Sequence, residues 1–380
     1  MAASLIERAE SREQSNREHV ELDRGYESMT HGKRTRRSFV RELMALGVTG
    51  PAALRSFAAT GTVEKALSPI RTRVPNPFME NGKPIVVVVK GDDYAAMLAK
   101  GMDVLGGFAR FGSGKSVIVK PNFVFDKKTR YPTTTDEDSV LTTVQYLQKD
   151  GFGNITVADR RGNRKNGRAG GKFDWSGLND LAEHGGFKTD SLMDDENAPT
   201  VHVGDDRWTT MPSIGVIKKV YEAGLIVNMP TLKKHSQTNL TCSLKNNMGV
   251  LDVPSTQYMH LWGDENKAAH DAMPHDEVIR RLCVAVAEAA MAVSPEVTVI
   301  DARKVLTLNH GSYARGGPLD ANRLIISGDP VAADVHAASV LKEVYEPYDL
   351  GFTRDTFAHA ADLGIGVADP NGVVVKSIEM

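Results

Sequence analysis

The chain has 380 residues, of which 41% are hydrophobic, and its 46 Lys and Arg residues nearly balance 48 Asp and Glu residues. This balance gives neither the basic footprint of a nucleic-acid-binding domain nor a polybasic membrane anchor. The two cysteines, Cys242 and Cys283, lie far apart in the sequence, which excludes a cysteine-ligated zinc site or iron–sulfur cluster held by this chain alone.

The amino-terminal region carries the pattern of an export signal. Residues 1–33 are polar and lack an apolar period. Arg36 and Arg37 follow, and a mild apolar stretch over 43–54 leads to the small residues Ser56, Ala58 and Ala59. This order resembles the twin-arginine export signal of bacteria, and the apolar stretch is too short to span a bilayer. The alternative is an ordinary amphipathic helix that contains an Arg-Arg pair.

These features predict three parts of the chain. Residues 1–59 form a twin-arginine signal region with a polar lead-in, 60–83 form a proline-rich extended linker, and 84–380 form a single large α/β domain. The expected location is periplasmic or otherwise extracytoplasmic. The expected partners are the twin-arginine export machinery and a small anionic molecule, with no nucleic acid and no stable membrane span.

The first half of the domain alternates strands and helices. β-Branched runs predict strands over 84–90, 115–120 and 153–159, and helical spacing predicts helices over 92–110 and 136–150. A β-α-β-α-β order favours a parallel sheet with right-handed crossovers, and continuous apolar runs favour strands covered on both faces.

The second half continues the same pattern around one irregular stretch. The predicted elements are a strand at 225–229, an irregular segment at 253–274, a helix at 276–293, strands at 297–301 and 323–327, and a helix at 330–345. The predicted fold class is therefore α/β, a mostly parallel doubly wound sheet with helices on both faces.

Polar residues follow the predicted strands where these end. They are Lys120-Pro121-Asn122, Asp159, the run 230–235, Asp301 and Gly328-Asp329. The carboxyl ends of strands in a doubly wound sheet share one edge, where such folds bind ligands. We therefore expect these residues to converge on one cleft at the strand carboxyl ends.

These segments together resemble a family known as domain of unknown function family 362. The recurring elements are present as Lys120-Pro121-Asn122, as the motif from Leu232-Lys233-Lys234-His235 through Thr238, Thr241 and Leu244-Lys245-Asn246 to Gly249, as His275, as Asp301, and as Asp329-Pro330-Val331-Ala332-Ala333-Asp334. The resemblance covers Pro84 to Asp369. The reaction of this family is not established, and the iron–sulfur segments associated with some members have no cysteines to match them here.

The predicted catalytic residues are Lys233, His235 and Lys245. Clustered cations lower one another's pKa and favour a bound carboxylate or phosphate. A lysine placed in this way can act as a base or a nucleophile, and His235 is the natural acid–base partner near neutral pH. The alternative is a solvated basic loop.

A second group is predicted to bind the ligand or cofactor. The Thr238 and Thr241 hydroxyls can donate to an anion, although β-propensity alone explains them equally well, and Asn122 has the alternative of a turn residue after proline. The cluster of Arg160, Arg161, Arg164 and Lys165 can clamp a phosphate, with a solvated loop as the commoner alternative. The predicted binding set is Lys120, Asn122, Thr238, Thr241, Asn246 and Asp159.

A metal ion is one open alternative for the cofactor, which the sequence does not name. His275 stands out through the family resemblance, with Asp301 and Asp334 as carboxylate partners. His260 and His270 match no metal-binding spacing and are interpreted as separate loop histidines.

The sequence thus predicts an exported protein that binds a small anionic ligand or a metal-bound cofactor in a cleft lined by Lys and His. The favoured activity is an enzyme using Lys–His acid–base or metal-assisted chemistry. The alternative is a non-catalytic periplasmic binding or cofactor-delivery protein of a redox system.

Overall fold

The structure is a computed structural model that describes residues 67–123, 131–160, 177–192, 198–307 and 318–380. The twin-arginine pair Arg36-Arg37 and the rest of the predicted signal region lie outside the described residues, so the export signal stays a prediction. None of the helices within the described ranges has the length and apolar composition needed to cross a membrane.

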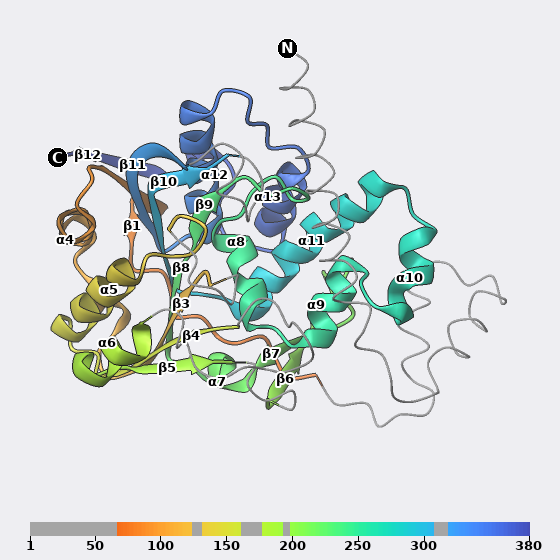
Figure 1. Ribbon diagram of the computed structural model, residues 1–380, viewed down its shortest axis with the longest axis horizontal. Coiled ribbons are helices and arrows are strands. Elements are labelled where there is room, and N and C mark those ends of the chain that lie inside the picture. Colours follow the sequence, from red (N-terminus) through yellow and green to blue (C-terminus); the bar gives the residue numbers. More distant parts are fainter. Residues whose placement is uncertain (1–66, 124–130, 161–176, 193–197, 308–317) are drawn as a thin grey trace, which may run out of the picture.

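One large sheet runs through the described part of the domain (Figure 1). Its strand order is β1-β2-β11-β10-β8-β3-β4-β5, with β12 paired to β2 and β9 paired to β10. The strands are β1 (Met79–Glu80), β2 (Lys83–Lys90), β3 (Ser116–Pro121), β4 (Asn154–Asp159), β5 (Lys188–Ser191), β8 (Leu225–Met229), β9 (Thr231–Lys233), β10 (Val297–Leu306), β11 (Pro318–Ser327) and β12 (Val374–Glu379). A separate antiparallel pair joins β6 (Thr200–Val203) to β7 (Ile214–Ile217).

The sheet is mostly parallel, as the sequence predicts. Strand β3 pairs in parallel with β4 and β8, and β10 pairs in parallel with β8. Strand β11 is antiparallel to both β10 and β2. The expectation that all strand ends meet at one edge is therefore wrong for Gly328-Asp329, because the carboxyl end of β11 lies at the opposite edge. There Asp329 caps the next helix by accepting from Val331 N and Ala332 N.

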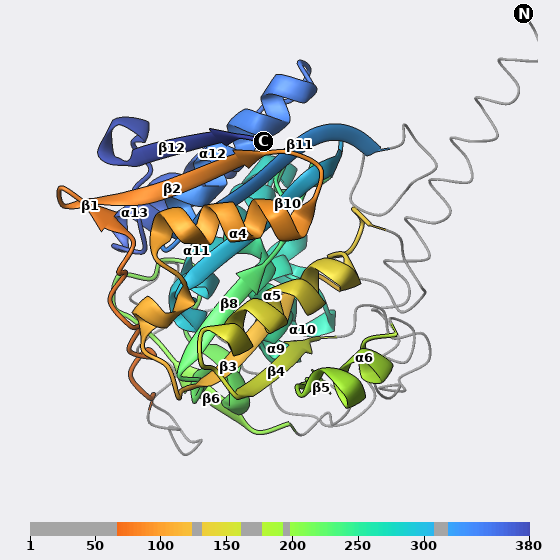
Figure 2. The same ribbon diagram turned by 90° about the vertical axis from the view of Figure 1, so that its left-hand side faces the viewer.

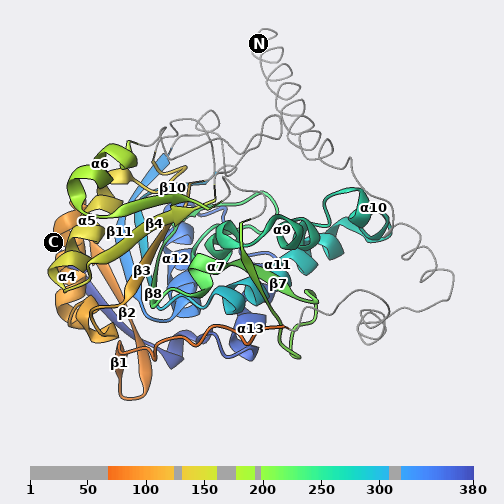
Figure 3. The same cartoon turned by 90° about the horizontal axis from the view of Figure 1, so that it is seen from below.

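Helices cover both faces of the sheet (Figures 2 and 3). Neighbouring residues of β2 show why: Val86 packs into one hydrophobic core and Val87 into the other, because successive side chains point to opposite faces. One face carries α4 (Tyr94–Leu105), α5 (Glu137–Lys149) and α6 (Leu178–Gly185), with the short η1 (Phe108–Phe111). The other carries α8 (Ser243–Asn246), η3 (Asn247–Val250), α11 (His275–Val293), α12 (Pro330–Val344) and α13 (Thr353–Asp362).

The segment 253–274 is helical, so the prediction of an irregular stretch is wrong. It forms α9 (Val253–His260) and α10 (Asp264–Asp271). Asp252 caps α9 by accepting from Ser255 N at 2.8 Å, and Pro254 occupies the first turn, where its missing N–H costs nothing. Each of these two helices, which are separated by Gly263, is too short to show a recognisable helical spacing of apolar residues in the sequence. The remaining short helices are α7 (Lys218–Tyr221) and η5 (Pro370–Gly372).

The described part of the predicted linker, residues 67–83, is packed onto the domain. Arg71 is 7% exposed and forms an ion pair with the fully buried Glu296 at 2.8 Å. Its guanidinium also donates to Ala223 O and Ser294 O. These bonds hold the segment to the sheet edge opposite the predicted cleft, because Glu296 directly precedes β10.

Candidate functional site

A buried ion pair joins the ends of two neighbouring strands. Lys120 of β3 donates to Asp159 Oδ1 of β4 at 2.7 Å, and the two residues are 2% and 3% exposed. Asp159 also accepts from Phe123 N and Arg160 N, so hydrogen bonds satisfy both carboxylate oxygens. Burial raises the pKa of Asp159 and lowers that of Lys120, and their mutual attraction opposes both shifts. The donors around Asp159 favour its ionised form.

Gly249, the last residue of the motif, makes this pair possible. A Cβ at this position would lie 2.4 Å from Asp159 Oδ1 and 2.8 Å from Lys120 Nζ, closer than any side chain tolerates. The carbonyl of Gly249 also accepts from Arg160 N at 3.1 Å. The η3 backbone therefore closes over the ion pair, and a glycine is required there for close approach.

Asn246 of α8 connects the strand ends to one another. Its Oδ1 accepts from Lys120 Nζ at 3.0 Å and from Asn122 Nδ2 at 2.9 Å, and its Nδ2 donates to Asn228 Oδ1 at 2.7 Å. Asn228 in turn donates to Ser243 O. The predicted residues Lys120, Asn122, Asp159 and Asn246 are thus brought together, whereas Asn228 was missed because it lies inside an apolar run that predicts a buried strand.

Lys233 is buried without an anionic partner among the residues that the structure describes. Its side chain is 1% exposed, and its Nζ donates to Thr133 O at 2.6 Å and to Asn122 Oδ1 at 3.1 Å, both neutral acceptors. Burial, followed by repulsion from Lys245 and Lys120, lowers the pKa of Lys233 to about 7. Its ammonium and its free amine are therefore both populated near neutral pH.

Lys245 is the second cation of the motif and is half-buried on α8. The one hydrogen-bond partner of its Nζ within the described residues is Met248 Sδ at 3.6 Å, a weak acceptor. Desolvation lowers the pKa of Lys245 to about 8; the nearby Cys283 opposes this shift, and Arg160 adds to it. Like Lys233, it has no carboxylate within ion-pair distance in the described part of the chain.

His235 lies at the turn that leaves β9. Its Nδ1 accepts from Gln237 N and Thr238 N, both at 3.2 Å, which assigns the ring proton to Nε2 in the neutral form. The Thr238 hydroxyl donates to Leu240 O and so shapes this turn.

Two threonine hydroxyls beside Lys233 are buried without a hydrogen-bond partner in the described residues. Lys233 and Thr241 pair across an antiparallel bridge, which places their side chains on one face, and Thr231 lies two residues before Lys233 on the same strand face. Both Thr231 Oγ1 and Thr241 Oγ1 are unsatisfied. Buried hydroxyls normally find a partner, so these two are candidate ligand donors.

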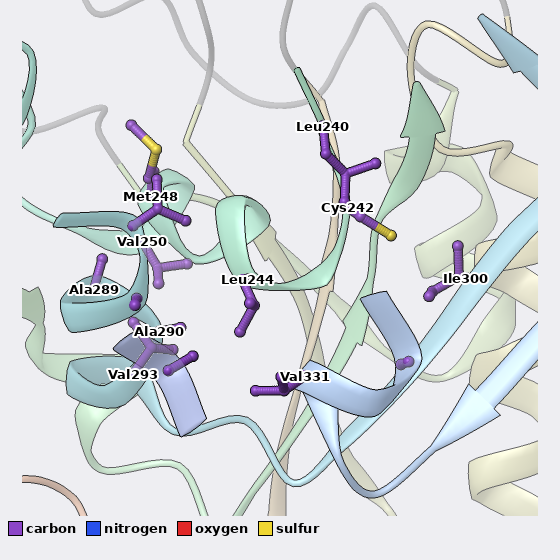
Figure 4. Close-up of a cluster of buried hydrophobic side chains, with 14 of the residues drawn as sticks. Leu240, Cys242, Leu244, Met248, Val250, Ala289, Ala290, Val293, Ile300 and Val331 are labelled. Carbon is purple, nitrogen blue, oxygen red and sulfur yellow. The ribbon is translucent and has the colours of Figure 1, made fainter. Parts of the chain in front are cut away.

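The apolar side of α8 anchors the motif in the core. Figure 4 shows Leu240, Cys242 and Leu244 among buried side chains that include Ala290 of α11 and Val331 of α12. A small pocket beside this core is lined by Thr238, Leu240, Cys242, Leu244, Lys245, Val286, Asp334, Thr353, Thr356 and Phe357. The half-buried Lys245 thus borders a mainly apolar space.

The predicted metal ligands His275, Asp301 and Asp334 are not brought together. Asp334 accepts from Ser243 N and Leu244 N and so caps α8, with burial raising its pKa to about 7. Asp301 pairs with Arg303 at 2.8 Å, and His275 is exposed at the start of α11. The described ranges contain no group of three or more His, Cys, Asp and Glu residues placed to hold a metal ion.

His260 and Arg160 belong to the same region, although the sequence favoured a plain loop position for each. Both contact Thr256 of α9: His260 Nδ1 lies 2.8 Å from Thr256 O, and Arg160 donates to Thr256 Oγ1 at 2.8 Å. The His260 ring stacks on Trp262 with 3.9 Å between centroids. A helical reading of 253–260 would have placed Thr256 and His260 one turn apart. Arg161, Arg164 and Lys165 lie outside the described residues.

A protein-family model matches residues 117–339, from β3 into α12, under the description "Domain of unknown function (DUF362)". This match spans more than half of the chain and contains every buried residue of the site. The chain belongs to the DUF362 family. The thylakoid-associated protein sll1697 of Synechocystis sp. is 23% identical to this DUF362 protein over 246 residues, which are 63% of this chain and 68% of the relative.

Two solved structures resemble the fold of this DUF362 protein. The lactate racemase apoprotein from Thermoanaerobacterium thermosaccharolyticum matches with a TM-score of 0.45 and 14% identity, over 68% of this chain and 57% of the racemase. A protein from Thermotoga maritima matches with a TM-score of 0.37 and 14% identity, over 72% of this chain and 60% of that protein. This chain therefore spans less than two thirds of either structure.

The charge at this edge of the DUF362 domain is unevenly distributed. Asp159 neutralises Lys120, but Lys233 and Lys245 have only neutral contacts among the described residues. The field is therefore positive where two hydroxyls lack a partner among those residues. Such a site can hold an anion, and lysines whose pKa is near neutral can exchange a proton with it.

Proposed function

We propose that this DUF362 protein binds a small anion at the carboxyl edge of its sheet and acts on it by Lys–His acid–base chemistry. The observation that carries the proposal is the pair of ammonium groups, on Lys233 and Lys245, that lack a carboxylate partner among the described residues. A buried charge without a counterion is costly, and a bound anion would supply the missing partner.

The catalytic part of the proposal assigns a role to each side chain. Lys233, with a pKa of about 7, takes or gives a proton near neutral pH. His235, which carries its ring proton on Nε2, is the second acid–base group. Lys245 holds the negative charge of the ligand, and the Thr231 and Thr241 hydroxyls donate to its oxygens.

Inorganic phosphate is expected to raise the melting temperature of the wild-type protein. The Lys245→Met substitution is expected to reduce the affinity of the protein for phosphate at least about tenfold, because it removes one charged hydrogen-bond donor. Calorimetric titration with phosphate measures this affinity. Lys100→Met, which removes an exposed ammonium on α4, is the matched control and keeps wild-type binding. Equal affinity in all three proteins would contradict the proposal.

We also propose that the protein is exported through the twin-arginine route, on the evidence of Arg36, Arg37 and the apolar stretch that follows. In bacterial fractionation, the full chain is expected in the periplasm. A double Arg36→Lys and Arg37→Lys variant keeps the charge and is expected to stay in the cytoplasm. Arg55→Lys, after the apolar stretch, is the control. Cytoplasmic retention of the wild-type chain would overturn the export proposal.

A further inference from the structure

The imidazole of His260 offers Nε2 as a hydrogen-bond acceptor beside the motif that carries the cations. The ring is 8% exposed, and its Nδ1 faces Thr256 O at 2.8 Å. A carbonyl oxygen only accepts, so Nδ1 carries the ring proton and Nε2 presents a lone pair. No hydrogen-bond partner of Nε2 occurs in the described residues.

The ring stays neutral because its surroundings oppose a positive charge. Desolvation, followed by repulsion from Lys245, lowers the pKa of His260 to about 3; the hydrogen bond to Thr256 O opposes this shift, and Arg160 and Arg281 add to it. Arg281 is occupied by donation to Tyr258 O and Met259 O. Stacking on Trp262, with 17° between the planes, fixes the ring orientation. Nε2 is therefore an acceptor over the whole physiological pH range.

The cations of the motif are donors, so the site combines both hydrogen-bonding functions. Arg160 links His260 to the motif, because its side chain donates to Thr256 Oγ1 and its backbone N donates at 3.1 Å to the carbonyl of Gly249, four residues after Lys245. The Nζ of Lys245 has only a thioether as hydrogen-bond partner in the described ranges. A ligand oxygen that carries negative charge suits Lys245. The lone pair of Nε2, in contrast, would repel a charged oxygen and needs a ligand N–H or O–H.

We infer that the anion bound beside Lys245 carries its own hydrogen-bond donor and donates it to His260 Nε2. The site therefore binds a protonated oxyanion of the hydrogen-phosphate type and rejects a fully deprotonated one. This inference rests on the proposed anion-binding function. Leaving a buried acceptor unpaired costs the complex its desolvation penalty, whereas a matched donor restores the bond. The same physical difference separates two tetrahedral dianions of similar size, hydrogen phosphate and sulfate.

The test compares phosphate with sulfate by calorimetric titration of the full chain at about pH 8, where both anions are mainly dianions and only phosphate retains a proton. Wild-type protein is expected to bind phosphate at least about tenfold more tightly than sulfate. His260→Phe keeps a ring to stack on Trp262 but removes the acceptor, and it is expected to bring the two affinities to within about twofold through loss of the phosphate preference. His270→Phe, at an exposed position of α10, is expected to keep the wild-type preference.

Arsenate and molybdate extend the comparison in the wild-type protein, so the test does not depend on the folding of the variant. Arsenate retains a proton and is expected to bind like phosphate, whereas molybdate is expected to bind like sulfate. Equal affinity for phosphate and sulfate would overturn the role of His260 but leave the anion site intact. Failure to bind any of the four anions would overturn the proposed function as well. A phosphate preference that persists in a folded His260→Phe protein would also overturn the inference.

Discussion

Lys233→Met is expected to raise the free energy of unfolding by about 1–3 kcal/mol at pH 7 in the absence of anions, while anion binding is lost. The ammonium of Lys233 is buried without a counterion in the described part of the chain, and methionine fills a similar volume without the charge. The gain is below the full desolvation cost, because Asn122 Oδ1 and Thr133 O lose a donor. A stabilised but inactive variant is the signature of a residue kept for function.

The pH dependence of the free energy of unfolding tests this prediction independently. Burial lowers the pKa of Lys233 to about 7 from the ordinary lysine value of 10.5, so between these values the unfolded chain binds more protons than the folded one. Wild-type stability attributable to this group therefore rises with pH across that window. The advantage of Lys233→Met is expected to be full below about pH 7 and to disappear toward about pH 10.5, as measured by urea unfolding. Destabilisation by Lys233→Met at pH 7 would assign the lysine a structural role.

Lys120→Met is expected to have the opposite effect, a loss of about 3–5 kcal/mol in the free energy of unfolding. Lys120 is as buried as Lys233, but its removal leaves the Asp159 carboxylate at 3% exposure without a cation. The Asn246 side chain, which accepts from the same ammonium, also loses a donor. Chemical unfolding of the single variant measures the loss.

Two controls separate charge from packing in this prediction. Lys120→Met combined with Asp159→Asn removes both charges and is expected to recover part of the loss, because the remaining partner is neutral. Lys90→Met breaks an ion pair with Glu379 whose side chains are 50% and 78% exposed, and it is expected to cost less than about 1 kcal/mol. A loss as small for Lys120→Met as for Lys90→Met would show that the buried pair is not ionised.

Much of the architecture could be predicted from local patterns. The β-branched run at 84–90 forms β2 with side chains in both cores, and the run at 225–229 forms β8 in the middle of the sheet. The helical spacing of apolar residues over 276–293 predicts the bounds of α11 to within one residue. These patterns predict the elements correctly because a strand buried on both faces needs a continuous apolar run, and a helix buried on one side needs an apolar stripe at helical spacing.

Elements that depend on distant partners were missed or misplaced. Nothing local distinguishes the antiparallel β11 from its parallel neighbours, and its direction moved Asp329 to the far edge. Helix α9 has almost no apolar period, so it is recognisable mainly from the Asp252 cap and Pro254. His260 consequently looked like an isolated loop residue, although Thr256 joins it to Arg160.

The sequence by itself determined strands β2, β3, β4, β8, β10 and β11, helices α4, α5, α11 and α12, and the position of the motif that carries Lys233, His235 and Lys245. These features follow from apolar period and from residues close together in the chain. Only the tertiary structure decided that Asp159 neutralises Lys120 and leaves Lys233 and Lys245 without a carboxylate among the described residues. Pairing between strand ends depends on distances set by the sheet. The charge that remains unpaired, and with it the candidate function, is therefore a property of the folded chain.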